Sequence, residues 1–479
     1  MENIATPKII YSNDLKNKNY SLSPWLYSKV NIYNKNIKKL SEILDDDLTT
    51  KYLGKEISRK SYINNSDYYF LTTRALNEDF FTLDKYSQSE IPMNPKKFKK
   101  LNLQKNNIII AKDAKPGEVV ILDKDYPNHM LSGGMYKLPL YDDIFYYFSI
   151  LKSKFFKDQL NAKVPRGATL KHAGKLFLDC LIPIATESQK KLLSNLTQSI
   201  ILKENMIRKK QELTNETILN HLTSNSNELK KCYPRINEIM NENRIDTGIY
   251  THEFKMIESL LKNYKNSYFC LDKKKIQIGS TPKKRLIDEN LNLKFNWITP
   301  DYISDFGTLI KKVKINCDKA NIKKNSVLII NRTSKAGLGQ YVGISNFYDF
   351  KKYGYARCNQ GIYILSDFSD EDLIFITSFL NSKLMRSYCG NVSLGAKMKE
   401  MKSFHFSKIP FPNFDAEIKK KIINYYYQKL DYEININDFD LKSDQEFNEK
   451  AGILDLQEAI IKIKNIIRDQ IYMLTMKKN

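Results

Sequence analysis

The sequence lacks the features that mark a membrane protein, a disulfide-bonded secreted protein or a metalloprotein. No apolar run approaches the ~20 residues of a membrane-spanning helix, and the N-terminus has no basic stretch followed by an apolar one. The six cysteines lie 31 to 52 residues apart, and no two cysteines or histidines have the spacing of a metal-ligand pair. We therefore expect a cytoplasmic protein with free thiols, no metal site and no membrane partner.

The sequence also lacks a recognisable catalytic constellation. His172 and His405 have no serine or cysteine near them in a nucleophile pattern. The segment Gly167–Lys175 departs from the spacing of a phosphate-binding loop, and no glycine-rich cofactor loop or Asn-Pro-Pro-Tyr motif of an adenine methyltransferase is present. The acidic run Asp45–Asp47 lacks the spacing of a nuclease site. We therefore expect a non-catalytic chain that binds no cofactor itself.

Arginine is scarce, but positive charge is abundant. The chain has 77 Lys+Arg against 54 Asp+Glu, which gives a net charge of +23, and only 11 of the basic residues are arginines. A soluble chain with this charge favours a polyanionic partner, of which nucleic acid is the commonest. A composition rich in lysine, asparagine and isoleucine also follows from an AT-rich genome. Hydrophobic residues at 42% are sufficient for a folded core.

An internal repeat is the most informative feature, and it is too long for a solenoid. Short stretches of the first half recur in the second half in the same order, at offsets of 219 to 229 residues. Six pairs in one order indicate a duplicated domain. The pairs are Phe70–Thr73 with Trp297–Pro300, Ile108–Ile110 with Val327–Ile329, Gly134–Leu138 with Gly361–Leu365, Leu151–Lys154 with Leu380–Lys383, Gly167–Lys171 with Gly395–Lys399, and Ile182–Pro183 with Ile409–Pro410.

Each repeat has the same predicted order of elements. The β-branched runs Asn107–Ala111 and Ser326–Ile330 predict buried strands bounded by turn residues. One helical stretch follows in each repeat, at Asp143–Leu160 and at Asp370–Tyr388, and a short strand at the Ile-Pro pair ends the repeat. The sequence therefore predicts a mixed α/β fold with two repeated globular domains, at residues 1–185 and 233–412.

A helix-rich segment follows each predicted domain, at residues 186–232 and 413–479. Thr186–Gln189 has the pattern of a capping box, and apolar residues recur at helical spacing in 187–222 and in 453–474. We expect these two helices to pack on each other, antiparallel and coiled-coil-like, between the globular domains; packing of each helix on its own domain is the alternative. The apolar positions are Leu193, Leu196, Ile200 and Ile207 in the first helix, and Leu456, Ile460, Ile463, Ile467 and Ile471 in the second.

These motifs, in this order, give the chain a family resemblance. Gly279–Pro282 followed by Trp297–Asp301 has a Gly-x-Thr-Pro … Trp-x-Thr-Pro pattern, and the chain resembles the DNA-specificity (S) subunit of a type I restriction–modification system over nearly its whole length. The first half departs from the pattern, because Gly54–Ile57 stands in place of Gly279–Pro282. Further motifs that carry the resemblance are Asn243–Asp246, Arg357–Gly361, Gly167–His172, Ile182–Ile184 with Gln189, and Ala451–Ile453.

The resemblance implies a fold and a function. Two target-recognition domains would alternate with two conserved helical regions, and the chain would bind double-stranded DNA at a bipartite, asymmetric site. Two methyltransferase subunits, and possibly motor-nuclease subunits, would be directed to that site for DNA methylation and phage defence. S-adenosylmethionine would be bound by the methyltransferase subunits. The nine apolar helix residues named above would belong to the helices on which those subunits dock.

Candidate DNA-binding residues lie in the loops of the two repeats. Lysine suits phosphates, whereas arginine and amide side chains suit base edges, so the few arginines in these loops are informative. Lys112 and Lys115 are expected to correspond to Arg332 and Lys335 across the repeat. For any one of these residues a solvated surface charge is the alternative. The candidates are Arg74, Lys112, Lys115, Arg166, Thr169, Lys171, His172, Arg332, Lys335, Arg357, Arg386, Lys397 and Lys399.

Three other functions stay open at this stage. The chain could be the recognition subunit of a type II-like restriction–methylation enzyme or of an orphan methyltransferase, and the neighbouring genes would distinguish these contexts. It could be a nucleic-acid-binding adaptor without a methyltransferase, which a salt-dependent, sequence-blind gel shift would indicate. It could also be an enzyme that acts alone, which assays of the purified chain would test. The residue types of the loops do not predict which bases are recognised.

Overall fold

A computed structural model describes most of the chain, and it divides into two compact units. Unit 1 comprises residues 1–205, 433–446 and 459–479, and unit 2 comprises residues 206–432 and 447–458. Each unit therefore combines one globular domain with parts of the helical segments. The described residues are 4–5, 9–17, 20, 22, 27, 29–30, 32–84, 89–164, 172–223, 234–242, 244–283, 286–288, 293–311, 313–333, 341–395 and 398–476.

The first domain, formed by the described residues up to 185, is built on two small sheets. In one sheet, β6 (Ile108–Ala111) pairs antiparallel with β7 (Val119–Ile121) and β9 (Met135–Leu138). In the other, β4 (Tyr69–Leu71) pairs antiparallel with β5 (Glu90–Pro92) and parallel with β8 (His129–Leu131). Smaller elements are β1 (Ile4–Ala5) with β2 (Lys29–Val30), β3 (Ile37–Lys39) with β10 (Leu181–Pro183), and α1 (Ser12–Asn17).

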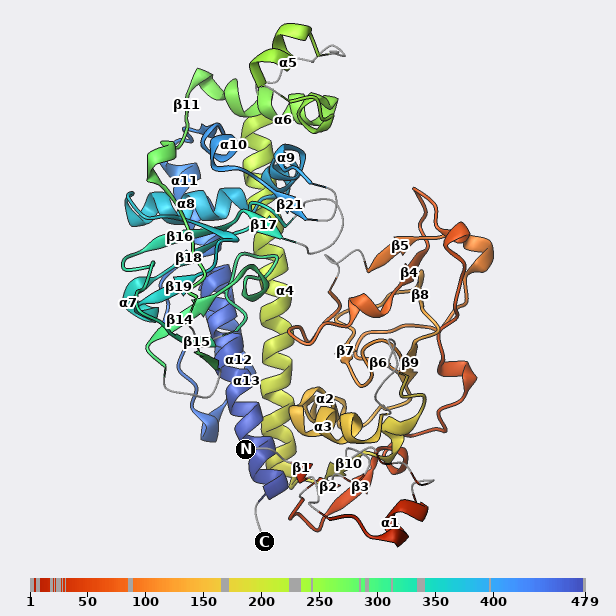
Figure 1. The fold of residues 1–479 in the computed structure, drawn as a ribbon. Helices are drawn as coiled ribbons and strands as arrows, with labels where there is room; N and C mark the ends of the chain where they lie inside the picture. The colour runs from red at the N-terminus through yellow and green to blue at the C-terminus, as the bar shows by residue number, and fades with distance from the viewer. Residues whose placement is uncertain are drawn as a thin grey trace. The chain divides into compact units, whose positions relative to one another are not determined.

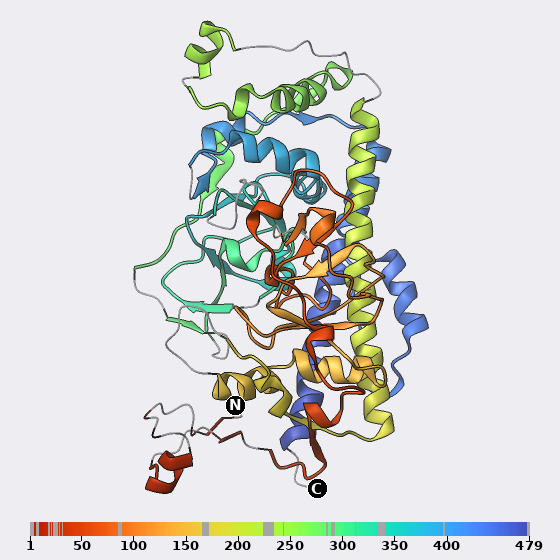
Figure 2. The ribbon, with the colours of Figure 1, turned by 90° about the vertical axis from the view of Figure 1, so that its right-hand side faces the viewer.

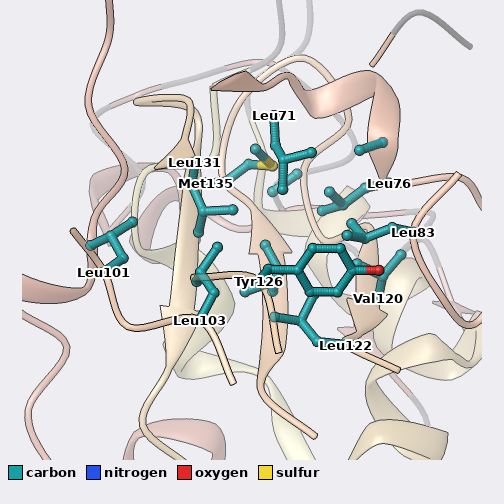
Figure 3. Close-up of a cluster of buried hydrophobic side chains, with 13 residues drawn as sticks. Leu71, Leu76, Leu83, Leu101, Leu103, Val120, Leu122, Tyr126, Leu131 and Met135 are labelled. Carbon is teal, nitrogen blue, oxygen red and sulfur yellow. The ribbon is translucent and has the colours of Figure 1, made fainter. Parts of the chain in front are cut away.

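A hydrophobic core joins these two sheets. Figure 3 shows side chains from both sheets, Leu71 and Leu131 from one and Val120 and Met135 from the other, packed around Tyr126. All are almost completely buried. The β-branched run at 108–110 is buried on both faces, so it reads as a continuous apolar segment rather than an alternating one.

The second domain, formed by the described residues of 234–412, repeats this arrangement with larger sheets. One sheet has the order β12-β20-β16-β18 and the other β13-β15-β14-β19. Two short pairs, β17 with β21 and β11 with β22, complete its strands. The bounds are β11 (Tyr268–Phe269), β12 (Ile276–Ile278), β13 (Leu286–Asp288), β14 (Phe295–Ile298), β15 (Val313–Asn316), β16 (Ser326–Ile330), β17 (Arg332–Thr333), β18 (Ser345–Tyr348), β19 (Ala356–Cys358), β20 (Ile362–Leu365), β21 (Lys399–Glu400) and β22 (Phe411–Pro412).

Strand pairing confirms the duplication predicted from the sequence. The central strands β6 and β16 each pair antiparallel with two neighbours, β7 and β9 in one domain and β18 and β20 in the other. The parallel pair β4 with β8 has its counterpart in β14 with β19. One detail differs from the prediction: the closing strand of the second domain is Phe411–Pro412, two residues beyond Ile409–Pro410. The second repeat has two X-Pro pairs, and the later one forms the strand.

Each helical stretch predicted as one helix is two helices. The first is divided into α2 (Ile144–Lys152) and α3 (Lys154–Lys163), and the second into α8 (Asp370–Leu380) and α9 (Lys383–Val392). The Ser153 hydroxyl accepts a hydrogen bond from the Phe156 N–H at 3.3 Å, and the Ser382 hydroxyl accepts one from Met385 N–H at 3.3 Å. Each serine is thus the N-cap of the second helix, which explains why this serine recurs across the repeat.

The remaining helices flank the domains and link the units. In the second domain these are α5 (Ile236–Glu242), α6 (His252–Lys262), α7 (Phe350–Tyr353) and α10 (Ser403–Ser407). Gln189 reaches back to accept a hydrogen bond from the backbone N–H of Thr186 at 3.1 Å, as the capping-box pattern predicts. Figures 1 and 2 show α4 (Glu187–Thr223) as one uninterrupted helix. The other helices that follow the domains are α11 (Ala416–Tyr426), α12 (Leu441–Lys450) and α13 (Ile453–Met476).

Within unit 1, the first part of α4 and the last part of α13 run antiparallel beside each other (Figures 1 and 2). A buried ion pair between Lys203 of α4 and Asp444 of α12 lies in the same unit. Burial lowers the pKa of Lys203 to about 8, although the carboxylate partly offsets this cost. The mixed α/β class, with two domains and a pair of long antiparallel helices, is therefore confirmed.

No helix within the described residues is long and apolar enough to cross a membrane. The described part of the chain also contains no cluster of histidine, cysteine and acidic residues able to hold a metal ion. Its cysteines are free, and burial raises the pKa of the Cys180, Cys358 and Cys389 thiols to about 12. These three behave as small core residues.

Candidate nucleic-acid interface

In the first domain, the loops that follow β4, β6 and β8 meet at one edge of the sheets. Lys112 follows β6, and its backbone N–H donates to the Gly134 carbonyl at 2.8 Å. Its backbone carbonyl accepts from the Ala173 N–H at 2.8 Å, which brings in the segment that begins at residue 172. Thr73, beside Arg74, lies against the same glycine. We call this edge the first rim, defined by residues 54–56, 73–76, 112–115, 132–134 and 172–173.

The first rim carries exposed basic groups and one internal ion pair. Arg74 and Lys115 are exposed, and the Lys115 Nζ donates to the Leu76 carbonyl at 3.2 Å. Asp113 accepts from Lys112 Nζ at 2.6 Å and lies 2.8 Å from His172 Nδ1. The structure thus brings together four predicted site residues, and it adds a carboxylate that orients two of them.

The second domain has an equivalent edge. The Asn331 N–H donates to the Gly361 carbonyl at 3.0 Å, and its carbonyl accepts from the Met401 N–H at 2.8 Å. Arg332 lies opposite Glu400, and Thr333 lies opposite Lys399, in the antiparallel pair of β17 with β21. Figure 1 shows these two strands side by side. We call this edge the second rim, defined by residues 279–281, 299–303, 331–333, 359–361 and 399–401.

These hydrogen bonds correct the predicted pairing of basic residues across the repeat. The residue with the same backbone contacts as Lys112 is Asn331, not Arg332. Arg332 instead corresponds to Asp113, because Arg332 faces Glu400 in the same way that Asp113 faces His172. The sequence alignment was shifted by one residue, since basic side chains were matched instead of backbone positions. The two rims therefore present different side chains at equivalent points.

The Gly54 segment, which departs from the family pattern in sequence, has the same backbone contacts as the Gly279 segment. The Gly54 and Gly279 N–H groups donate to Met135 and Ile362 carbonyls, at 3.0 and 2.9 Å. A Cβ atom on Gly54 would lie 2.1 Å from the Ser132 carbonyl oxygen, and one on Gly279 would lie 2.0 Å from that of Asn359. Only glycine permits this close approach of two loops.

The residues after these glycines differ in chemistry, and the sequence-based set of candidates did not include them. In the first rim the Glu56 carboxylate accepts from the Gly133 N–H at 3.0 Å. In the second rim the hydroxyl of Thr281 donates to the exposed side chain of Gln360. Gly133 and Gln360 occupy equivalent positions of the repeat, and this equivalence was the signal that could have identified Glu56, Thr281 and Gln360 as candidates.

Two predicted arginines have their nitrogens engaged within the second domain. The Arg357 guanidinium donates to the Ser280 carbonyl at 2.8 Å, to the Ser280 hydroxyl at 2.7 Å and to the Lys319 carbonyl at 2.9 Å. The Arg386 Nη1 donates to the Asp305 carbonyl at 3.2 Å, and its guanidinium lies 5.6 Å from the Tyr341 ring centroid. Arg357 thus fixes the 279–281 segment of the second rim. The predicted site residues Arg166, Thr169, Lys171, Lys335 and Lys397 lie outside the described residues.

The apolar residues predicted on partner-binding helices are buried within this chain. Each of the nine side chains has 5% or less of its surface exposed, because these residues form the inner faces of α4 and α13. A partner on these helices would contact other faces, where Leu202 and Leu219 are exposed. The residues are Leu193, Leu196, Ile200, Ile207, Leu456, Ile460, Ile463, Ile467 and Ile471.

Comparisons with known proteins find similarity at the level of structure alone. No protein-family model and no curated protein sequence matches the chain. The structure is similar to the S subunit of the type I restriction–modification system from M. genitalium, with 13% identity, a TM-score of 0.40, and coverage of 92% of this chain and 96% of that one. It is also similar to the HsdS subunit from Thermoanaerobacter tengcongensis, with 11% identity, a TM-score of 0.26, and coverage of 92% and 97%. A third similar chain comes from a study of complex assembly and conformational transition of the type I R-M system, with 13% identity, a TM-score of 0.28, and coverage of 92% and 98%.

Proposed function

We propose that the chain is a type I restriction–modification specificity subunit that binds double-stranded DNA at a bipartite, asymmetric site. It directs two methyltransferase subunits, and motor-nuclease subunits where these exist, to that site. S-adenosylmethionine belongs to the methyltransferase subunits, and this chain supplies recognition without catalysis in the cytoplasm. The proposal joins the motif resemblance of the sequence to the two rims described above.

The observation that carries the proposal is that two copies of one scaffold present different side chains at equivalent positions. Lys112, Asp113 and His172 of the first rim have Asn331, Arg332 and Glu400 as their counterparts in the second rim. Basic side chains suit phosphate contacts, whereas amide, guanidinium and carboxylate groups can discriminate base edges. Equal scaffolds with unequal rims are what recognition of two different half-sites requires.

The first test is to co-express the chain with the methyltransferase encoded beside it, in a host that lacks adenine methylation, and to map methylated adenines. We expect one bipartite motif with unequal halves. Exchange of residues 41–185 for those of a related chain with another motif should change one half only. An assembled complex that leaves the DNA unmethylated would contradict the proposal.

A second function is favoured by the net charge of +23 alone, namely a nucleic-acid-binding adaptor without a methyltransferase. Such a chain would bind any duplex with similar affinity, and the affinity would fall steeply with salt. Competition between a duplex that contains the mapped motif and one with a scrambled motif distinguishes the two functions. A type II-like or orphan methyltransferase context would leave the bipartite motif in place but would lack a motor subunit in the purified complex.

A further inference from the structure

We propose that Glu204 of α4, together with Lys464 of α13, is a positioning residue that fixes the first domain on the long helices and thereby sets the gap between the two DNA half-sites. The inference rests on the proposed function, since a gap exists only where two half-sites are bound. Both residues and the segment that they hold belong to unit 1. We call this arrangement the clasp, defined by Glu204, Lys464 and residues 79–82.

Glu204 holds the segment by three hydrogen bonds. One carboxylate oxygen accepts from the Phe81 N–H at 2.8 Å, and the other accepts from the Thr82 N–H at 3.0 Å and from the Thr82 hydroxyl at 2.7 Å. Glu204 is only 4% exposed. Hydrogen bonds to a buried charged group are among the strongest in a protein, and leaving such a group without partners is costly.

Lys464 holds the same segment from the other helix. Its Nζ donates to the Asp79 carbonyl and lies 5.3 Å from the centroid of the Phe81 ring. Burial lowers the pKa of Lys464, and the Glu204 carboxylate opposes that shift. The two helices thus present charges of opposite sign to one short segment of the first domain.

The segment that is clasped continues directly into the first rim. The backbone N–H of Asp84 donates to the Ala75 carbonyl at 2.9 Å, and Asn77 Nδ2 donates to the Asp84 carboxylate at 2.9 Å. These bonds close residues 75–84 into a compact loop. The neighbouring Leu76 carbonyl accepts from Lys115 of the rim. A displacement of the segment at Glu204 would therefore also displace Arg74 and Lys115, through a few hydrogen-bonded residues.

The second domain is fixed to α4 by another set of contacts. In unit 2, Gln211 Nε2 donates to the Asn381 carbonyl at 3.0 Å, and the Asn215 side chain accepts from the Lys383 N–H at 2.8 Å. These contacts are neutral and hold the α8–α9 junction instead of a rim loop. On α13, Glu458 also pairs with Lys352 and accepts a hydrogen bond from the Tyr353 hydroxyl. None of these contacts involves Glu204, Lys464 or residues 79–82, so removal of the clasp leaves the fastening of the second domain intact.

A firmly fixed domain makes the gap strict for a geometric reason. A change of one base pair between half-sites moves one of them along the duplex and rotates it by about 34°, since B-DNA has about 10.5 base pairs per turn. A domain that cannot tilt on its helix cannot follow that rotation. Loosening the clasp should therefore broaden the accepted gap without changing the bases recognised in either half-site.

The experiment compares Glu204→Gln, Thr82→Val and Thr82→Ser in the full chain, co-expressed with the methyltransferase as above. Glu204→Gln places an amide donor against backbone donors, and Thr82→Val removes one hydrogen bond while keeping the side-chain shape. We expect both variants to methylate the wild-type half-sites at gaps one base pair longer or shorter, at least about tenfold more often than wild type, as the loss of a hydrogen bond to a charged group predicts. Thr82→Ser keeps the hydroxyl and should therefore keep the wild-type gap.

The matched control is Glu78→Gln, which neutralises a carboxylate in the same loop that is 57% exposed and should leave the gap unchanged. A wild-type chain that yields no bipartite motif would refute the proposed function. A wild-type bipartite motif with an unchanged gap in either folded variant, or with altered half-sites, would refute the clasp. If neither variant accumulates as a folded chain, the clasp is a requirement for folding, and its positioning role is likewise refuted.

Discussion

In the first domain Lys152 stands where the second domain has Asn381, at the junction between the two helices that follow the central sheet. Lys152 is buried and pairs with Glu118 at 2.5 Å, and its Nζ also donates to the Asn77 and Val119 carbonyls. Asn381 makes neutral bonds instead, accepting from the Ser345 N–H at 2.9 Å and donating to the Ser345 carbonyl at 2.8 Å. The carbonyls of Val119 and Ser345 are themselves counterparts across the repeat, because Val119 pairs with Ile110 in β6–β7 and Ser345 pairs with Ile329 in β16–β18.

The difference shows that the scaffold needs a side chain at this junction that bridges the helices to the sheet, but that this side chain can be charged or neutral. The charged bridge, Lys152, carries a free-energy cost of burying charge that the neutral bridge, Asn381, lacks. Glu118 pairs with Lys157 at 2.8 Å as well as with Lys152, so one carboxylate faces two ammonium groups. Burial lowers the pKa of Lys152 to about 8, and the nearby Lys157 lowers it further, although Glu118 opposes the shift. The neutral bridge has no group that titrates.

The largest expected effect comes from breaking the side-chain contact at this junction in each domain. Glu118→Ala leaves Lys152 buried without its carboxylate and should destabilise the first domain by about 3–5 kcal/mol. Asn381→Ala removes the neutral side chain that binds the Ser345 N–H and carbonyl, and it should cost the second domain less, about 1–3 kcal/mol. Hydrogen exchange of peptides from β6–β7 and from β16–β18 gives the free energy of opening for each domain. Equal losses in the two domains would show that the charged bridge has no special cost.

A pH titration sharpens the same comparison. The folded pKa of Lys152 lies below its ordinary value of 10.5, so the cost of burying its charge is fully present below pH about 8 and disappears as the pH rises toward 10.5. The wild-type first domain should gain roughly 1–3 kcal/mol of stability across this window relative to Lys152→Met, which has no such group. Urea unfolding of both proteins, monitored by the protease sensitivity of first-domain peptides, measures the difference in stability at each pH. A difference that stays constant with pH would contradict the lowered pKa.

The smallest expected effect tests what the two domains share. Ser153→Ala and Ser382→Ala each remove the N-cap of the helix after the junction and should each cost about 1 kcal/mol. The costs should be similar, because both hydroxyls accept from an N–H at 3.3 Å. Domain-resolved hydrogen exchange of α3 and α9 provides the measurement. A clearly larger loss in one domain would mean that the two junctions are less alike than their geometry indicates.

The scaffold could be predicted from the sequence wherever backbone geometry constrains residue type. The buried strands Ile108–Ala111 and Ser326–Ile330 and the recurring serines at 153 and 382 are such positions. The equivalence of Gly54 and Gly279 could not be predicted, because the requirement for glycine arises from a carbonyl group about 80 residues further along the chain, at Ser132 or Asn359. Sequence comparison of the residues beside each glycine had no access to that contact.

The candidate interface was harder to predict for a different reason. Charged residues have side chains whose partners come from distant segments, as Arg357 does with Ser280 and Lys319. Residue type alone therefore could not separate an arginine that fixes a loop from one on the rim. The shift of one residue between Lys112 and Arg332 has the same origin, because charge was compared where backbone pairing decides the match. Whether the rim residues bind DNA stays a prediction.

The division of the C-terminal helices between the units bears on how the chain folds during synthesis. Unit 1 contains the first domain but also residues 459–479, whereas unit 2 uses nothing beyond residue 458. Domains usually fold in the order in which the ribosome makes them. Here the domain that emerges first is completed last, because residues 459–479, which include Lys464 and most of α13, are translated after the whole of unit 2. The first domain is therefore the one that a chaperone, or a premature stop near the end of the message, would affect most.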